Sequence, residues 1–147
     1  AGQIEYLELC GVSITSGACV GVLVHSLTSP HSSLKKLKLE NCTISSSDYH
    51  HLTTAIATSN LTHFTSNCSL HNDVSAAKGL ATALTHSKTL EEVEVMELPK
   101  MNNDVAVILA EAMNHSSVKK LTIGRIRSST VLDCNYPKDR VVINHYL

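Results

Sequence analysis

Tryptophan is absent from this 147-residue chain, and aromatic residues make up only 3% of it. A core without large rings has to be built from leucine, isoleucine, valine and alanine, as in a regular stacked fold. Hydrophobic residues nevertheless reach 43% of the chain, so the material for a core is present. A single domain of this length can bury roughly 70% of the surface that its unfolded chain exposes.

The chain also lacks an excess of charge of either sign, since its formal net charge is -1. Surfaces that attract nucleic acid or anionic lipid need a cationic excess, so we expect no nucleic-acid and no membrane partner. The longest apolar run, 18–24, is far shorter than the roughly 20 residues of a transmembrane helix. No start of the signal-peptide type is present. These features favour a cytoplasmic protein.

Motifs of catalysis and of metal or cofactor binding are missing as well. The five cysteines form no C-x-x-C pair, which argues against a zinc site or a disulfide framework. There is no G-x-x-x-x-G-K-[ST] phosphate loop, no G-x-S-x-G elbow, no H-R-D and no H-E-x-x-H motif. We therefore predict a protein that is not an enzyme, holds no metal or cofactor, and keeps its cysteines reduced.

A repeated motif is present instead. Residues 34–44, LKKLKLENCTI, have the spacing L-x-x-L-x-L-x-x-(N/C)-x-I. Alternation at Leu37 and Leu39 predicts a short strand with one buried face. Similar units start near positions 4, 34, 61, 90 and 118, which lie 30, 27, 29 and 28 residues apart. The third unit is one residue short in its turn and carries polar Ser66 where leucine is expected.

Helices are predicted between these strands. Apolar pairs spaced i, i+4 occur at Leu23/Leu27, Leu52/Ile56, Leu80/Leu84 and Leu109/Met113. That spacing places each pair on one helical face, and the small residues around it allow close packing. Side-chain oxygens predict helix starts at Ser16, 46–48, 72–73 and 102–104, and we expect ends near Ser29, Ser59, His86 and His115. Strand–helix–strand units of this length make neighbouring strands parallel.

The units resemble the ribonuclease-inhibitor-like class of leucine-rich repeats. The best stretches are 79–84 (GLATAL) with 90–93 (LEEV), and 109–113 (LAEAM) with 118–121 (VKKL), which look like the C-terminal repeats of NOD-like receptors. The resemblance implies an α/β solenoid of about five repeats over 1–127, with parallel strands on the concave side and helices on the convex side. It also implies a sensing or autoinhibitory role in innate immunity, in which the repeats bind a protein ligand or another domain of the same chain.

The repeat fades at the C-terminus. Apolar runs at 131–134 and 141–143 flank the turn-forming segment 135–139. Residues 128–147 are predicted to form a C-terminal cap or hairpin, the alternative being a flexible tail. At the other end, Ile4 begins in mid-pattern and leaves an open strand edge, which suggests that further repeats precede it.

Residues between the buried strand positions would face the concave surface. The partner-binding candidates are Tyr6, Glu8, Lys36, Lys38, His63, Thr65, Glu92, Glu94, Lys120 and Thr122. Because neighbouring strands lie about 4.8 Å apart, ion pairs are predicted for Glu5/Lys35, Glu8/Lys38, Glu91/Lys119 and Glu92/Lys120. This alternation of charge is typical of a binding face, and it is also typical of pairing that only keeps a surface soluble.

Structural roles are predicted for several chemically active side chains. His86 and His115 recur at helix ends, where they can contact exposed carbonyl groups. Cys42 and Cys68 lie in turn positions where small buried groups are expected. Neither pattern indicates a metal site or a nucleophile with its base.

Three alternative functions remain open within the same repeat class. One is a stand-alone ribonuclease-inhibitor-like binder. Binding of basic nucleases would favour a strongly acidic protein, and the net charge of -1 argues against it. The second is a regulator of a small GTPase, for which none of Arg125, Arg127 and Arg140 can be assigned a role from spacing. The third is a protein that binds the ends of actin filaments.

Overall fold

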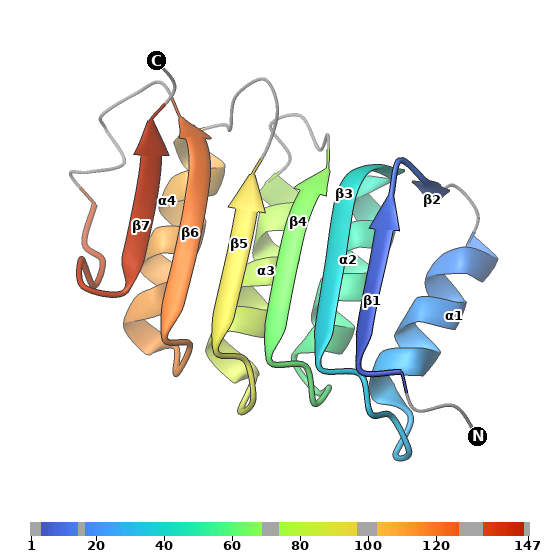
Figure 1. Ribbon diagram of the computed structural model, residues 1–147. Helices are drawn as coiled ribbons and strands as arrows, with labels where there is room; N and C mark the ends of the chain where they lie inside the picture. Colours follow the sequence, from blue (N-terminus) through green and yellow to red (C-terminus); the bar gives the residue numbers. More distant parts are fainter. Residues whose placement is uncertain (1–3, 15–16, 69–73, 97–102, 127–133, 146–147) are drawn as a thin grey trace.

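The computed structural model describes residues 4–14, 17–68, 74–96, 103–126 and 134–145. In these residues the chain forms an open, seven-stranded parallel sheet with four α-helices (Figure 1). The strands are β1 (Tyr6–Cys10), β2 (Ser13–Ile14), β3 (Lys36–Ile44), β4 (His63–Cys68), β5 (Glu92–Met96), β6 (Lys120–Ile126) and β7 (Val141–His145). The helices are α1 (Gly17–Thr28), α2 (Ser46–Ile56), α3 (Val74–His86) and α4 (Asn103–Ala112), and the 3-10 turn η1 (Met113–His115) follows α4.

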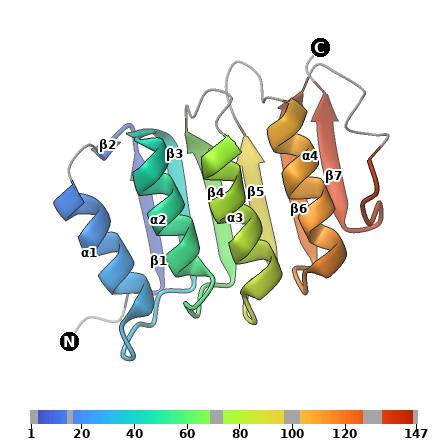
Figure 2. The same ribbon diagram turned by 180° about the vertical axis from the view of Figure 1, so that it is seen from behind.

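The strands lie in sequence order across the sheet, β1-β3-β4-β5-β6-β7, and the short β2 pairs with the end of β3. All pairs of neighbouring strands are parallel, as the sequence predicts. The helices pack side by side in one layer against one side of the sheet, so none of the described helices lies on the other side (Figures 1 and 2). We call this uncovered side of the sheet the open face.

The core lies between the sheet and the helix layer. In β3, Leu37 and Leu39 are 1% and 0% exposed, whereas Lys36 and Lys38 point to the open face. The same alternation aligns one buried row across the sheet: Leu7, Leu37, Phe64, Val93, Leu121 and Val141. Leu7 on the edge strand β1 is only partly buried, whereas its row partners are buried.

Local side-chain hydrogen bonds define the ends of α2. The Ser45 hydroxyl accepts the N–H of Asp48 at 3.2 Å, so the cap lies one residue before the predicted start. The helix ends at Ile56 and not at Ser59. Ser59 donates to the Ile56 carbonyl at 2.8 Å and accepts the Leu61 N–H at 3.2 Å, so it forms a turn that competes with further helix. Ser16, 72–73 and 102, predicted at other helix starts, lie outside the described residues.

Close approach of α2 and α3 depends on a residue without a side chain. A Cβ atom on Gly79 would lie 2.5 Å from Thr53 Oγ1 and 3.0 Å from the Cα of His50. Such distances are well inside van der Waals contact, so only glycine fits this helix–helix contact without displacement. Gly79 was not among the small residues from which the sequence predicted close helix packing.

The short turn of the third unit is also confirmed. The register between β3 and β4 shifts at Asn41, so β3 has one residue more than β4 at this point. Asn41 has a φ of 53°, and Gly11, its equivalent in the first unit, has a φ of 66°. Glycine and asparagine tolerate this left-handed conformation best. The third unit omits the residue, and β4 continues directly to Cys68.

The C-terminal segment adds a strand to the sheet. Val141 pairs with Leu121 in parallel, and Arg140 donates to the carbonyls of Met113, Ser116 and Val118 at 2.8–2.9 Å. This guanidinium therefore supplies donors to carbonyl groups where η1 ends and β6 begins, and the Met113 carbonyl also accepts the Ser116 N–H at 3.3 Å. The expected hairpin needs a partner strand at 131–134, most of which lies outside the described residues.

Candidate binding face

Two rows of mostly polar side chains cross the open face, as the strand register defines them. The first row is Tyr6, Lys36, His63, Glu92 and Lys120, and the second is Glu8, Lys38, Thr65, Glu94, Thr122 and Val142. Every predicted partner-binding residue lies in one of these rows. The period of two along each strand is the reason, because side chains next to buried positions must face the other way.

A third row lies further along the strands and was missed in the sequence. It consists of Cys10, Glu40, Asn67, Met96 and Gly124. One more step of the same alternation, two residues beyond each second-row position, would have identified it. The third row matters because Glu40, Asn67 and Met96 line a hollow in the open face.

The predicted pair Glu8/Lys38 is confirmed, at 3.6 Å between Lys38 Nζ and Glu8 Oε1. Lys38 Nζ also lies 3.6 Å from Glu40 Oε2, a pair that the sequence did not predict. The carboxylate of Glu40, followed by that of Glu8, raises the pKa of Lys38 above its ordinary value. Lys38 is thus within ion-pair distance of two carboxylates, that of Glu8 on β1 and that of Glu40 on β3.

The predicted pair Glu91/Lys119 is confirmed too, with 2.9 Å between Lys119 Nζ and Glu91 Oε1. Both residues precede their strands, so this pair lies at the edge where the strands begin. The hydrogen bond from Lys119, together with its positive charge, lowers the pKa of the Glu91 carboxyl. Because both side chains are well exposed, the pair contributes little to folding.

The other two predicted pairs do not form among the described residues. Glu92 lies 3.9 Å from the Nε2 of His63, on the side opposite Lys120. The other ring nitrogen, Nδ1, lies 2.9 Å from the Thr62 hydroxyl, which orients the imidazole. Glu5 and Lys35 are joined through the backbone instead, since the Lys35 N–H donates to the Glu5 carbonyl at 2.8 Å.

These pairings leave three charged groups of the open face without an ion-pair partner in the described part of the chain: Lys36, Glu94 and Lys120. Lys36 and Lys120 are exposed, and Glu94 is partly buried. They occupy strands β3, β5 and β6, so a positive, a negative and a positive group follow each other across the face. A partner with the opposite pattern would complete them.

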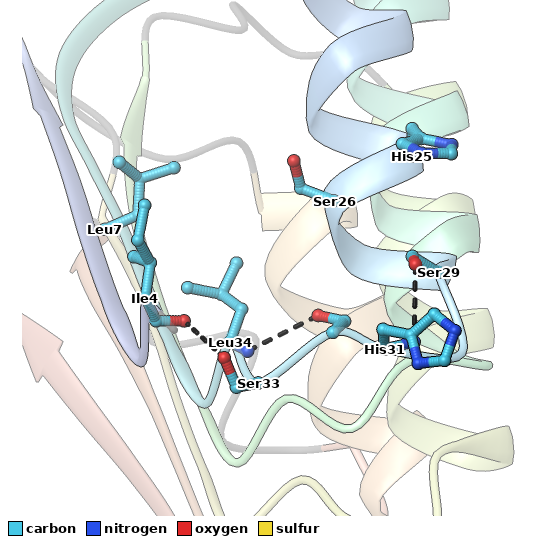
Figure 3. Close-up of a pocket in the computed structure, with 9 residues that line it drawn as sticks. Ile4, Leu7, His25, Ser26, Ser29, His31, Ser33 and Leu34 are labelled. Atoms are coloured by element: carbon cyan, nitrogen blue, oxygen red, sulfur yellow. Dashed lines mark hydrogen bonds between the residues drawn. The ribbon is translucent and has the colours of Figure 1, made fainter. Parts of the chain in front are cut away.

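A separate hollow of about 270 Å³ lies between β1 and α1 (Figure 3). Ile4 and Leu7 line it from the strand side and His25 from the helix side. The Ser33 hydroxyl donates to the Ile4 carbonyl at 3.3 Å along its rim. The hollow lies beside the edge strand β1, and Val22 on α1 is exposed. The lining of the hollow combines apolar Ile4, Leu7 and Leu34 with serine and histidine side chains. We assign the candidate site to the open face, where all the predicted partner-binding residues lie.

The cysteines predicted to be packed are buried. Cys42 donates its S–H to the Leu9 carbonyl at 3.2 Å, and Cys68 is 3% exposed. Burial raises the pKa of Cys68 to about 11, which keeps it a thiol at neutral pH. Among the described residues, no group of three or more histidine, cysteine, aspartate or glutamate side chains is placed to hold a metal ion.

The histidines at helix ends differ from each other. The Nδ1 of His86 lies 3.1 Å from the Thr82 carbonyl at the end of α3, as predicted for a side chain that contacts a terminal carbonyl. His115 is exposed at the end of η1, and it makes no such contact with another described residue. The predicted role is therefore confirmed for His86 only.

A scan against protein-family models found no match, and a search of the curated proteins found none either. The described residues define an α/β protein whose helices all cover the same side of a parallel sheet. In the described part of the chain, no helix has the length and hydropathy needed to cross a membrane.

Proposed function

We propose that this chain is a non-enzymatic protein-interaction domain. Its open face binds a protein ligand or another domain of the same chain. The observation that supports this most is the placement of all the predicted partner-binding residues in two rows on a surface that none of the described helices covers. A flat array of polar side chains on a rigid sheet suits a protein partner better than a small molecule, which needs a deep pocket.

The finer proposal is a leucine-rich-repeat solenoid of the ribonuclease-inhibitor-like class. The strand–helix unit recurs in register, and Leu37, Phe64, Val93 and Leu121 occupy one core row. By resemblance, we propose the sensing or autoinhibitory repeats of a cytoplasmic NOD-like-receptor-type protein. Each repeat adds a strand to the face, so the bound partner would contact several repeats at once.

The alternative of a small-GTPase regulator loses one of its three candidate arginines. The Arg140 guanidinium donates hydrogen bonds to three carbonyl groups of its own chain. Arg140 is therefore unavailable for a partner's active site. Arg127 and the side chain of Arg125 lie outside the described residues. A GTP hydrolysis assay with purified GTPases tests this alternative directly, since a regulator of this kind accelerates hydrolysis.

The experiment that tests the main proposal compares two charge-swapped variants. K36E/E94K reverses two charges of the open face that lack ion-pair partners in the described structure, so it leaves the existing pairs intact. K78E/E111K makes the same swap on exposed residues of α3 and α4. Both variants keep the net charge of the chain.

Affinity capture from cytosolic extract, quantified by mass spectrometry and followed by binding to the purified candidate, provides the measurement. We expect a specific partner to be lost with K36E/E94K and retained with K78E/E111K, while the circular dichroism of both variants matches that of the parent. Equal retention by the two variants would place the binding surface elsewhere.

A further inference from the structure

We propose that the open face receives a basic side chain, lysine or arginine, of the bound protein in a trough above Thr65 and Asn67; this inference rests on the proposed function. The trough follows from side-chain length. The short Thr65 and Asn67 of β4 lie between Lys38 and Glu40 of β3 and the equally long side chains of β5. Because the side chains of β4 are shorter than those of the strands on either side, a hollow forms along β4.

The size of the trough limits what it can hold. The hollow along β4 has a volume of about 150 Å³, and it is lined in addition by Glu94 and Met96 of β5. A second hollow of about 90 Å³ adjoins it and shares Thr65 and Glu94. Pockets for small ligands usually measure roughly 300–1,000 Å³. One inserted side chain therefore suits the trough better than a metabolite does.

Charge selects a cation for this position. Glu40 of β3 and Glu94 of β5 lie on the two walls, and Lys38 is a cation of the β3 wall. Lys38 Nζ already lies 3.6 Å from both Glu8 and Glu40, so its charge is compensated twice. No cation of the described residues lies within ion-pair distance of Glu94, although this carboxylate lines both hollows. The trough thus has an excess of negative charge.

The remaining groups complement a lysine or arginine along its whole length. The Thr65 hydroxyl and the Asn67 side-chain carbonyl can accept hydrogen bonds from an ammonium or guanidinium group. Met96 offers a flexible apolar contact for the methylene stem. An apolar side chain in the same place would cover the Glu94 carboxylate without pairing it, which costs free energy. An acidic side chain would face two carboxylates.

Isotope-labelled protein titrated with small amino-acid amides tests the proposal without a known partner. The probes are N-acetyl-arginine amide and N-acetyl-lysine amide, with N-acetyl-norleucine amide as the neutral control of similar length. We expect the basic probes to shift the backbone amide resonances of Thr65, Asn67 and Met96 in a saturable manner. Glu94→Gln should weaken this binding by about two- to five-fold, the range of a partly exposed ion pair. Glu111→Gln, on the exposed side of α4, should leave it unchanged.

Each other outcome overturns the inference. Equal shifts with the norleucine probe would mark an apolar site, and equal shifts around Glu111 would mark unspecific ion pairing. Absence of any shift at β4 and β5 would exclude a basic ligand in the trough. None of these results decides the proposed function, because the K36E/E94K capture experiment reports on the whole face. If the partner is lost with K36E/E94K but binds the Glu94→Gln variant normally, the proposed function stands and the proposal of a basic side chain in the trough is wrong.

Discussion

The hydroxyl of Tyr49 on α2 donates a hydrogen bond of 2.9 Å to the Ser66 hydroxyl on β4, and both residues are 2% exposed. Ser66 occupies a core position where the repeat pattern has an apolar residue, and Tyr49 is the large side chain that fills the space in front of it. Ser66 in turn donates weakly to the Cys68 sulfur at 3.8 Å. The polar Ser66 in this core position is therefore compensated by Tyr49, which fills the space beside it and donates a hydrogen bond to it.

A double-mutant cycle tests this pair. Tyr49→Phe removes the donor and leaves a buried serine hydroxyl, so we expect the free energy of unfolding to fall by about 1–3 kcal/mol. Tyr49→Phe combined with Ser66→Ala should recover part of the loss, since no polar group of the pair then remains. Urea unfolding of the four proteins measures a coupling energy expected at about 0.5–1.5 kcal/mol. Additive losses would show that the two hydroxyls do not interact.

Two glycines on helices should respond to alanine in opposite directions. Gly79→Ala places a Cβ 2.5 Å from Thr53 Oγ1 in the contact between α2 and α3, and we expect a loss of about 1–3 kcal/mol. Gly21→Ala on α1 meets nothing within 4 Å and should stabilise the protein by about 0.5–1 kcal/mol through helix propensity. Thermal unfolding of both variants is the measurement. A stabilising Gly79→Ala would mean that the two helices pack less closely.

Stability should depend on Cys68 at alkaline pH. Burial raises its pKa from 9.0 in the unfolded chain to about 11 in the folded one. The folded state holds the thiol proton more tightly than the unfolded chain does. The contribution of Cys68 to the free energy of unfolding is therefore complete below pH 9 and is lost as the pH rises from 9 to 11. Two pKa units correspond to about 2–3 kcal/mol. Urea unfolding at pH 8, 9.5 and 11 should show this loss in the parent but not in Cys68→Ala, and identical slopes would contradict the assignment.

Arg140 is expected to stabilise the C-terminal end of the sheet. Its guanidinium donates to three carbonyls at 2.8–2.9 Å, and Arg140→Met would leave them without these donors. We expect a loss of about 2–3 kcal/mol, given the strength of hydrogen bonds from charged groups. Arg140→Lys should recover only part, because one ammonium cannot reproduce the planar fork. Lys88→Met, at an exposed position, is the control and should change stability by less than about 0.5 kcal/mol.

Much of the open face was predictable, because it depends on a period of two. Once Leu37 and Leu39 are recognised as buried, Lys36 and Lys38 must lie on the other side of β3. The neighbours across strands follow from aligning the repeated strand motif of the units, which is why the Glu8/Lys38 and Glu91/Lys119 pairs were predictable. The extra residue at Asn41 was visible as a difference in turn length.

The partner choice of Glu92 was not predictable in this way. His63 and Lys120 lie in the same row on either side of it, and sequence spacing favours neither. Side-chain rotamers decide between them, and these depend on the packing around each residue. For the same reason, the trough above Thr65 and Asn67 becomes visible only when the lengths of side chains on three strands are compared in space.

The sequence by itself determined the order of strands and helices, their parallel arrangement and the side of the sheet on which each residue lies. Local periodicity carries that information, and the repeats supply it several times over. Only the tertiary structure decided which charges pair, where Arg140 donates and how Tyr49 compensates for Ser66. Those outcomes depend on distances between side chains from different elements, and the spacing of residues along the sequence does not predict such distances.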